Sequence, residues 1–305
     1  MIYFVVNPRS STGKGLKKWK AIEERLKADG IEYDVHFTQG YLDARNYTRE
    51  LVKGHEHITL AAVGGDGTVN EIVSGIEDFS RVTFGYIPTG SSNDLARSLN
   101  LKTDPVEALD AILHPIEYRE IDIGRIEAEN EVRNFAVSIG MNYDASVCHE
   151  VLHSTLKEKL NKLGLGKFTY LFIALKQLIR LRKCDCTMIL DDIKKVSLKD
   201  LIFVTVMNHK YEGGGFMFCP RASDNDGYLD ICSASGISKL KTLMLMPTAF
   251  KGHHVRAQGI EIKRAKKIEL ITSIPVAIHA DGESVGVGSH AVVSVNEKKL
   301  KMVIR

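Results

Sequence analysis

The sequence predicts two domains of different class: an N-terminal α/β domain with a parallel sheet and a C-terminal β-sandwich domain with helical inserts. Apolar runs alternate with helix-like patterns over residues 1–117, whereas strand-like runs dominate residues 118–298. The chain has 305 residues and 44% of them are hydrophobic, which is enough for two domains with separate cores. The last run, 299–305, is also strand-like, and it is left open whether it joins the first domain.

The first domain alternates predicted strands and helices. The expected strands are residues 2–7, 33–38, 58–63 and 82–87. The apolar residues Leu16, Trp19, Ile22 and Leu26 recur at helical spacing, and Gly30 is typical of a helix end. A helix is expected at 43–53, a second directly after the glycine loop that ends near residue 67, and a short third one that ends at residue 99. A fourth is expected to begin at Asp104, where an acid precedes a proline. This alternation favours a parallel sheet covered by helices on both faces.

The second domain has many predicted strands and two helical inserts. The strand-like runs are 118–127, 132–139, 188–190, 202–207, 229–234, 268–272, 276–280 and 291–295. The inserts, 151–183 and 239–267, each carry eight Lys or Arg and one acid among leucine, phenylalanine and methionine. Such segments form either solvated helices packed on the sandwich or a surface that meets anionic membrane.

Composition excludes several classes of protein. A formal charge of +3 is too small to indicate nucleic-acid binding. No signal peptide and no apolar window of membrane-spanning length are present, so a cytoplasmic protein is expected. Five scattered cysteines do not form a disulfide framework. The Cys184-x-Cys186 pair is spaced wrongly for zinc, and it is interpreted as two buried small residues.

Three loops rich in Gly, Ser, Thr and Asn follow predicted strands, at residues 7–15, 64–68 and 89–94. Ligands of parallel sheets bind at the carboxyl ends of the strands, so one rim is expected to gather these loops. Glycines allow close backbone approach, and a helix N-terminus attracts anions. The first loop is not a Walker A motif, because Pro8 and Gly15 stand where that motif needs a glycine and a hydroxyl.

The second and third loops together predict phosphoryl transfer. Their side chains supply donors for phosphate oxygens and acids for a magnesium ion: Asp66, Thr68, Asn70, Ser91, Asn93 and Asp94. Phosphoryl transfer needs this combination, because its catalysis is mostly positioning and charge neutralisation.

These two loops also resemble a known family. Residues 64–71 with 88–94 are similar to the catalytic domain of the diacylglycerol, sphingosine and ceramide kinases, in particular the soluble bacterial lipid kinases. The resemblance continues through Asn134 with 140–144, Asn208 with 213–215, 226–230 and 281–283. It implies an α/β nucleotide domain like that of NAD kinases and phosphofructokinases, followed by a β-sandwich.

The resemblance also implies the site. ATP is expected against Asn7, Ser10, Thr12, Lys14, Thr38, Gly64, Gly65, Asp66, Gly67, Thr68, Asn70, Glu71, Gly90, Ser91, Asn93 and Asp94. Asp66 is expected to help hold Mg²⁺ on the phosphates. Glu283, with Asp281 beside it, matches the proton acceptor for the lipid hydroxyl, which is a sensible role for a carboxylate. From the residues alone, 281–283 is a hairpin turn.

A second magnesium site follows only from the resemblance. In bacterial members one carboxylate and neighbouring carbonyls hold a structural Mg²⁺, and the matching residues here are Asp226, Ser223 and Tyr228. A lone carboxylate with carbonyls and waters is a usual magnesium site. Taken alone, residues 225–228 are a tight turn between strands.

The sequence therefore predicts an ATP-dependent lipid kinase, with diacylglycerol as the leading substrate and phosphatidic acid as its product. The expected partner is a lipid at the membrane surface, with peripheral membrane association and no nucleic acid; a homodimer is left open. Two alternatives also stay open. One is a soluble nucleotide kinase similar to NAD kinase, and the other is a non-catalytic lipid- or nucleotide-binding regulator.

Overall fold

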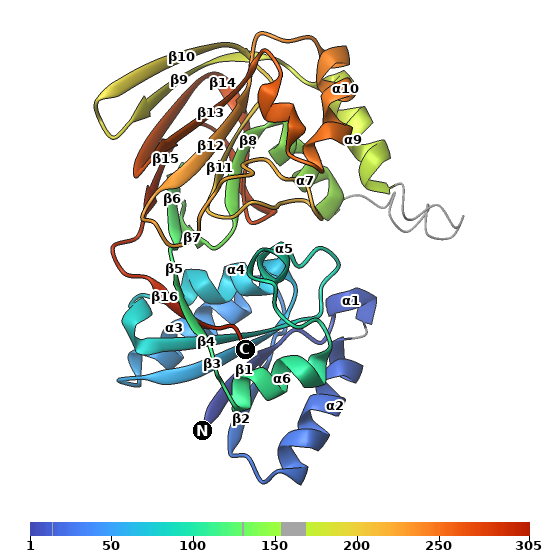
Figure 1. The fold of residues 1–305 in the computed structure, drawn as a ribbon, viewed down its shortest axis with the longest axis vertical. Helices are drawn as coiled ribbons and strands as arrows, with labels where there is room; N and C mark the ends of the chain where they lie inside the picture. Colours follow the sequence, from blue (N-terminus) through green and yellow to red (C-terminus); the bar gives the residue numbers. More distant parts are fainter. Residues whose placement is uncertain (14, 130, 154–168) are drawn as a thin grey trace.

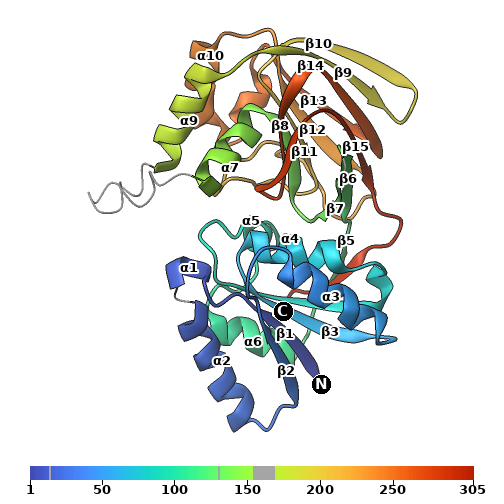
Figure 2. The same ribbon diagram turned by 180° about the vertical axis from the view of Figure 1, so that it is seen from behind.

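The protein has two lobes, which Figures 1 and 2 show from opposite sides. The computed structural model describes residues 1–13, 15–129, 131–153 and 169–305. The N-terminal α/β lobe and the C-terminal antiparallel lobe confirm the predicted fold class. Both chain ends lie in the α/β lobe, so the chain crosses between the lobes twice (Figure 1).

Within the described residues, the first sheet has six strands in the order β2-β1-β3-β4-β16-β5. All neighbours are parallel except β5, which runs antiparallel to β16. The strands are β1 (Ile2–Val6), β2 (Tyr33–Phe37), β3 (Ile58–Gly64), β4 (Val82–Pro88), β5 (Tyr118–Ile121) and β16 (Leu300–Val303). The helices are α1 (Ser10–Gly13), α2 (Gly15–Ala28), α3 (Asp43–Lys53), α4 (Asp66–Gly75), the 3₁₀ turn η1 (Phe79–Arg81), α5 (Asp94–Leu99) and α6 (Pro105–Leu113).

Helices cover both faces of this sheet. Trp19, Ile22 and Leu26 of the predicted α2 stripe are buried, whereas Leu16 at its start is 43% exposed. Trp19 packs with Phe4 of β1 and Leu109 of α6 on one face. Helices α3, α4 and α5 pack on the other face. The predicted N-cap of α6 is also present, because Asp104 Oδ1 accepts the N–H groups of Val106 and Glu107 at 3.0 and 3.1 Å.

The second sheet has ten antiparallel strands among the described residues and folds around a core of its own. Its strands are β6 (Gly124–Ala128), β7 (Glu131–Phe135), β8 (Ser138–Asn142), β9 (Cys184–Leu190), β10 (Lys194–Leu201), β11 (Phe203–Met207), β12 (Leu229–Ala234), β13 (Ile260–Ala265), β14 (Lys267–Ala280) and β15 (Glu283–Val295). The long β14 pairs with β15, β8 and β9, which lets the sheet close into a sandwich.

Three helices gather on one side of the sandwich (Figures 1 and 2). They are α7 (Tyr143–His153), α9 (Thr169–Arg180) and α10 (Lys239–Ala249), with the 3₁₀ turn η3 (His253–Arg256) following α10. They pack over β11 and β12 around a small apolar cluster that includes Phe203 and Cys232. Residues 154–168 of the first predicted insert lie outside the described residues.

The predicted strand 118–127 is wrong as a single strand. It is β5 in the first sheet and β6 in the second, and the chain passes between the sheets at Asp122 and Ile123. A period-two pattern cannot show this, because either sheet buries alternate residues. Since β16 lies between β4 and β5, we propose to place the domain boundary at Asp122 instead of residue 118.

The second predicted insert, 239–267, is also only partly helical. Its helix α10 ends at Ala249, and Ile260–Ala265 forms the edge strand β13. The prediction missed β10, because its Lys194, Lys195 and Lys199 give a polar pattern that is acceptable only on a sheet edge. Runs 268–272 and 276–280 are one strand, β14, with an irregularity between Ile271 and Val276.

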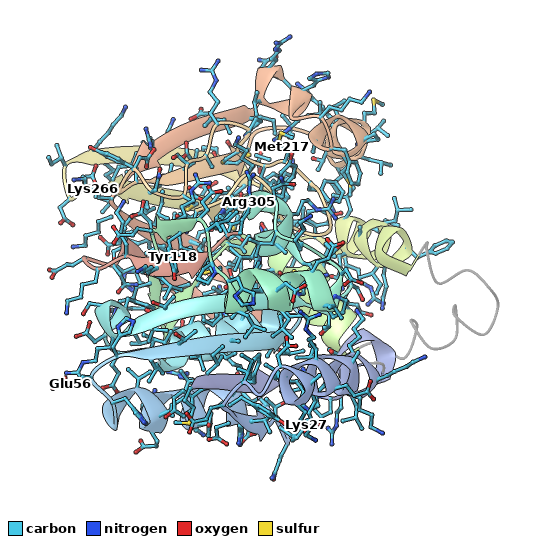
Figure 3. The ribbon with its side chains drawn as sticks, turned by 60° about the horizontal axis from the view of Figure 1, so that its bottom comes forward. Lys27, Glu56, Tyr118, Met217, Lys266 and Arg305 are labelled. Carbon is cyan, nitrogen blue, oxygen red and sulfur yellow. The ribbon has the colours of Figure 1, made fainter. Side chains whose placement is uncertain are left out.

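Charged side chains are spread over both lobes. The labelled Lys27 on α2 and Lys266 just before β14 lie on different domains (Figure 3). Cys184 and Cys186 are buried at alternate positions of β9, as the small-residue interpretation expects. Among the described residues, no helix is long and apolar enough to cross a membrane.

Candidate active site

The three predicted loops meet at the carboxyl ends of β1, β3 and β4. Asn7 Nδ2 donates to Thr68 Oγ1 at 3.1 Å, which joins the first loop to the second. The Ser10 and Thr89 hydroxyls are 2.7 Å apart, which joins the first loop to the third. Thr38 ends β2 on the same rim, where its N–H donates to Val6 O at 2.9 Å. This edge is where open parallel sheets bind ligands.

Glycines are required where the second and third loops touch. A Cβ on Gly90 would lie 2.6 Å from Gly65 Cα, so neither loop could carry a side chain there. A Cβ on Gly64 would collide with the Thr68 side chain. Helix α4 starts directly after Gly65, and its N-terminus presents backbone N–H groups to an anion. The backbone can therefore approach a phosphate closely.

Two acids lie beside this helix terminus. Asp66 accepts the Leu95 N–H at 3.5 Å, while both oxygens of Asp94 accept the Gly214 N–H at 3.1 and 3.0 Å. Burial, with the charge of Asp94 as a further cause, raises the pKa of Asp66 to about 7. Burial also raises the pKa of Asp94. A bound cation would offset the negative charge of these buried carboxylates, and carboxylate oxygens are ligands that Mg²⁺ prefers.

Three residues predicted to contact the nucleotide also hold the site together. Asn70 Nδ2 donates to Asp281 Oδ2 at 2.9 Å, and Asn93 Oδ1 accepts the Gly90 N–H at 2.9 Å. The two carboxylate oxygens of Glu71 accept the first N–H groups of the α3 region, from Leu42 and Ala44, at 3.1 and 3.2 Å. Asn70 Nδ2, Asn93 Oδ1 and both carboxylate oxygens of Glu71 therefore have protein partners.

Two other predicted contacts cannot be placed. Lys14 lies outside the described residues, and so does the side chain of Thr12.

The turn that carries the two predicted catalytic carboxylates connects β14 and β15. Asp281 has a φ of 50° and Gly282 a φ of 82°, so the turn uses left-handed backbone that suits glycine. The Asp281 carboxylate accepts the N–H groups of Ala136, Val137 and Ser138 at 2.9, 2.8 and 2.9 Å. With Asn70 added, Asp281 has four donors, and it anchors the turn to the β7–β8 connection.

Glu283 points back at the first domain. Its carboxylate lies against Gly67 of α4, where a Cβ would collide with Glu283 Oε1. Burial raises the pKa of Glu283, and the charge of Arg133 opposes that rise. A carboxylate from the second domain therefore faces the helix terminus and Asp66 of the first.

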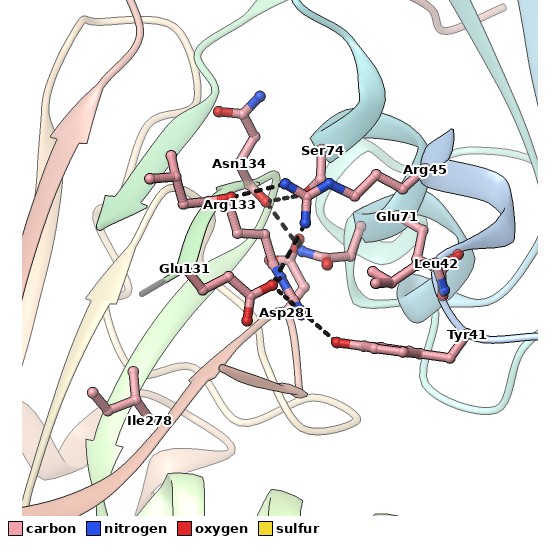
Figure 4. Close-up of polar contacts among 12 residues, drawn as sticks. Tyr41, Leu42, Arg45, Glu71, Ser74, Glu131, Arg133, Asn134, Ile278 and Asp281 are labelled. Carbon is pink, nitrogen blue, oxygen red and sulfur yellow. Dashed lines mark hydrogen bonds and ion pairs between the residues drawn. The ribbon is translucent and has the colours of Figure 1, made fainter. Parts of the chain in front are cut away.

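A polar network fixes the two domains at this point (Figure 4). Arg133 of β7 donates to Glu131 and, at 2.8 Å, to the Tyr41 hydroxyl of the first domain. Arg45 of α3 donates to Val132 O at 3.0 Å, and Ser74 of α4 donates to Asn134 O at 2.9 Å. Because β7 is held to both helices, the site is built between rigid elements.

A cavity of about 790 Å³ opens from this point into the second domain. One end is acidic and glycine-rich, with Asp66, Gly67 and Ser91 from the first domain and Glu283 from the second. The rest is walled by apolar side chains of α7, α9, α10 and the neighbouring segments, among them Phe203, Phe216, Phe218, Leu245, Met246 and Phe250. The cavity therefore joins the rim of the glycine-rich loops to an apolar chamber.

Family models match both halves of the chain. One described as the diacylglycerol kinase catalytic domain matches residues 1–126, and one described as the YegS C-terminal NAD kinase beta sandwich-like domain matches residues 137–304. The chain belongs to the diacylglycerol kinase and YegS-like lipid kinase family. This confirms the resemblance, and it confirms that the protein is a kinase.

Relatives of the kinase cover most of its length. A diacylglycerol kinase of Mycobacterium tuberculosis is 29% identical over 286 residues, covering 92% of this chain and 87% of the relative. One from Bacillus subtilis is 26% identical over 281 residues, covering 92% and 88%.

Solved structures share the fold. A Bacillus anthracis diacylglycerol kinase has a TM-score of 0.69 at 20% identity, with 99% of this chain and 96% of that chain covered. An Archaeoglobus fulgidus NAD kinase in complex with ATP has a TM-score of 0.53 at 15% identity, covering 99% and 93%.

The residues predicted to hold a structural magnesium in the kinase do not fit one. The Asp226 carboxylate is paired with the Arg264 guanidinium, which also lies 4.7 Å from the centre of the Tyr228 ring. Ser223 Oγ donates to Asn225 Oδ1 at 3.1 Å, and Lys299 Nζ donates to Asn225 O at 2.5 Å. Side-chain cations thus neutralise this loop, and we derive no step through a metal there.

Asp144 and Glu212 line the cavity, and the buried His279 lies between them. Asp144 ends the segment 140–144 that resembles the kinase family, whereas Glu212 and His279 were not predicted. Asp144, Glu212 and His279 offer potential ligand atoms that lie within 4.8 Å of one another. They come from the start of α7, the segment after β11 and the end of β14. Their separation along the chain leaves no local motif, although His279 stands two residues before Asp281 and Glu212 directly before Gly213.

Proposed function

We propose that the kinase transfers the γ-phosphate of ATP to a hydroxyl of a membrane lipid, with diacylglycerol as the leading candidate. The observation that carries the proposal is the single cavity that joins a phosphate-binding rim to an apolar chamber. A soluble nucleotide substrate would gain little from such walls, whereas acyl chains bury apolar surface there at about 25 cal/mol per Å². The names of the relatives support the same substrate class.

Each domain has its own part in this proposal. The three loops and the N-terminus of α4 would hold the ATP phosphates. A magnesium ion bound with ATP supplies neutralisation of phosphate charge, and Asp66, with Asp94 behind it, would hold it. Their carboxylates fit such an ion, because burial raises the pKa of both, with the charge of Asp94 adding to the rise for Asp66 and the charge of Glu212 adding to the rise for Asp94.

Glu283 is proposed to accept the proton of the lipid hydroxyl. The hydroxyl oxygen then forms a bond to the γ-phosphorus, the bond to the β-phosphate bridging oxygen breaks, and ADP leaves. Burial raises the pKa of Glu283 toward the pH at which the enzyme works, and a general base is most effective when its pKa lies near that pH. Asp281 cannot serve as easily, because four donors already occupy its oxygens. Its proposed role is to hold the turn.

The helices beside the cavity are proposed to meet the membrane. Leu240 and Met244 of α10 are exposed at 61% and 63%, and Phe250, which follows α10, both is exposed and lines the cavity. Lys239 and Lys241 stand on the same helix. A basic residue near anionic lipid contributes about 1 kcal/mol to membrane binding, and each exposed apolar side chain adds apolar area that the membrane can bury.

A phosphotransfer assay tests the proposal. The protein is incubated with labelled ATP, Mg²⁺ and mixed micelles that each contain one lipid, and NAD is included as a soluble acceptor. We expect label in a lipid, with diacylglycerol the best acceptor, and loss of that label in Asp66→Ala. Label in NAD alone would support the nucleotide-kinase alternative. No label in any acceptor, with Asp66→Ala binding ATP like wild type, would contradict catalysis.

A further inference from the structure

Asp144 and Glu212 flank His279, which is fully buried. Its Nε2 lies 3.0 Å from Asp144 Oδ2 and 3.0 Å from Glu212 Oε1. On the other side of the ring, Nδ1 accepts the N–H of Gly282 at 3.1 Å. His279 therefore connects two buried carboxylates to the backbone of the turn that carries Glu283.

The Gly282 contact fixes the protonation of this ring. A backbone N–H can only donate, so Nδ1 must present its lone pair, and the ring proton must be on Nε2. Two neighbouring carboxylates favour a charged imidazole, but a charged ring would direct an Nδ1–H at the Gly282 N–H. A proton that would charge the ring is better placed on one of the two carboxylates, and burial raises the pKa of Asp144 accordingly.

This tautomer also decides against a metal at the cluster. A metal ligated by His279 Nε2 would need the lone pair of that nitrogen. The Gly282 contact puts a proton there, and Nε2–H donates to the two carboxylates. The three residues have the composition of a metal site and the hydrogen bonding of an orienting network.

We propose that His279 is a positioning residue of the phosphotransfer reaction, oriented by Asp144 and Glu212. It holds the Gly282 N–H and so keeps the following residue, Glu283, aimed at the first domain. The inference rests on the proposed role of Glu283 as proton acceptor. The turn then has two anchors, because Asp281 is held by the N–H groups of 136–138 and Gly282 by His279.

The turn needs the second anchor because of its backbone. Asp281 and Gly282 both have positive φ, and β14 and β15 pair irregularly just before the turn, between Ile278 and His279. Left-handed residues in sequence are poorly determined by local preference, so tertiary contacts must select them. The contacts of Asp281 fix the first residue of the turn. For the second, Gly282, His279 provides the side-chain partner found among the described residues.

Three substitutions separate the two sides of the ring. His279→Asn keeps an acceptor near the Nδ1 position and can still bind the Gly282 N–H. His279→Gln keeps a donor near Nε2 for the carboxylates but loses the Gly282 contact. His279→Leu loses both. The two amide variants are polar and smaller or similar in size, so they report on function even where the leucine variant does not fold.

Steady-state kinetics with the best lipid acceptor gives the first readout. We expect His279→Gln to lower kcat by about 10- to 100-fold, with KM for ATP unchanged, because displaced catalytic groups cost rate in that range. His279→Asn should keep most of kcat. Equal losses in the Asn and Gln variants, or a wild-type kcat in the Gln variant, would overturn the proposal.

Hydrogen exchange of the turn gives a readout that needs no activity. The Gly282 amide should exchange at least 10-fold faster in His279→Gln than in wild type, and His279→Asn should stay near wild type. Thermal unfolding checks that both variants are folded. Unchanged exchange in His279→Gln would overturn the positioning role. A wild-type protein without kinase activity would refute the proposed function instead, and the exchange result would still decide the role of His279.

Discussion

At the residue scale, two carboxylates separated by one glycine have different environments. Asp281 is enclosed by four hydrogen-bond donors, whereas Glu283 lies at the acidic end of the cavity against Gly67. Residue type and spacing are therefore not enough to assign a base. The number of donors around each carboxylate separates an anchor from a proton acceptor.

Glu283→Gln tests this assignment directly. We expect kcat to fall by about 10² to 10⁴-fold, since general-base catalysis contributes that much, with KM for ATP nearly unchanged. Asp281→Asn is the matched control, and it should lower the melting temperature because buried N–H donors lose a charged acceptor. A Glu283→Gln enzyme with wild-type kcat would rule out the proposed base.

Asp66 gives a pH dependence with a definite sign. Its pKa is raised from an ordinary 3.8 to about 7, so the folded state binds this proton more tightly than the unfolded chain. The fold therefore loses stability as pH rises from about 4 to 7 and stays lower above that range. Asp66→Asn should raise the melting temperature more at pH 8 than at pH 5. Equal shifts at both pH values would contradict the raised pKa.

At the element scale, the N-terminus of α4 and the β14–β15 turn constrain each other through Gly67. Gly67→Ala should favour the helix by up to about 1 kcal/mol, but the new Cβ must displace the Glu283 carboxylate. We expect kcat to fall about 10-fold or more while the melting temperature is maintained. Wild-type kcat in Gly67→Ala would show that catalysis does not require the Glu283 carboxylate to lie against residue 67.

The loop 223–228 is an element stabilised by side-chain cations. We expect chelation of divalent metal to leave the wild-type melting temperature unchanged, because Arg264 already neutralises Asp226. Arg264→Gln should lower it by a few degrees, about 2 °C or more, and added Mg²⁺ should restore part of the loss. Lys263→Gln, on the same strand but paired with Glu261, serves as the matched control. Destabilisation of the wild type by chelation would instead support the structural magnesium.

At the scale of the whole molecule, the cavity spans both domains and opens beside α9 and α10. A double variant, Leu240→Ser with Met244→Ser, should weaken binding to anionic vesicles by about 10-fold or more, since each buried apolar side chain contributes about 1.5 to 3 kcal/mol. ATP binding should not change. Ile116→Ser is a matched control, because Ile116 is 84% exposed on the first domain. Equal vesicle binding by all three proteins would refute membrane docking through α10.

The sequence predicted the α/β lobe more completely than the second lobe. Strands buried on both faces, such as β3 and β4, are continuous apolar runs, and the α2 stripe is helical and buried except at Leu16. The errors fall in the sandwich, where β10 is polar because it lies on an edge and β13 follows a basic helix. Neither strand can be recognised from its own residues, because its place in the sheet depends on the strand with which it pairs.

The sequence by itself determined the loops of the candidate site, because glycines and small polar residues after a strand can serve only a few purposes. Tertiary structure alone decided what each side chain does there. Asn70 donates to the Asp281 carboxylate, and Glu71 accepts backbone N–H groups of Leu42 and Ala44. Arg264 stands where a metal was expected, and His279 meets Asp144 and Glu212. Local sequence fixes backbone shape, whereas hydrogen-bond partners from distant segments decide which polar atoms remain available for chemistry.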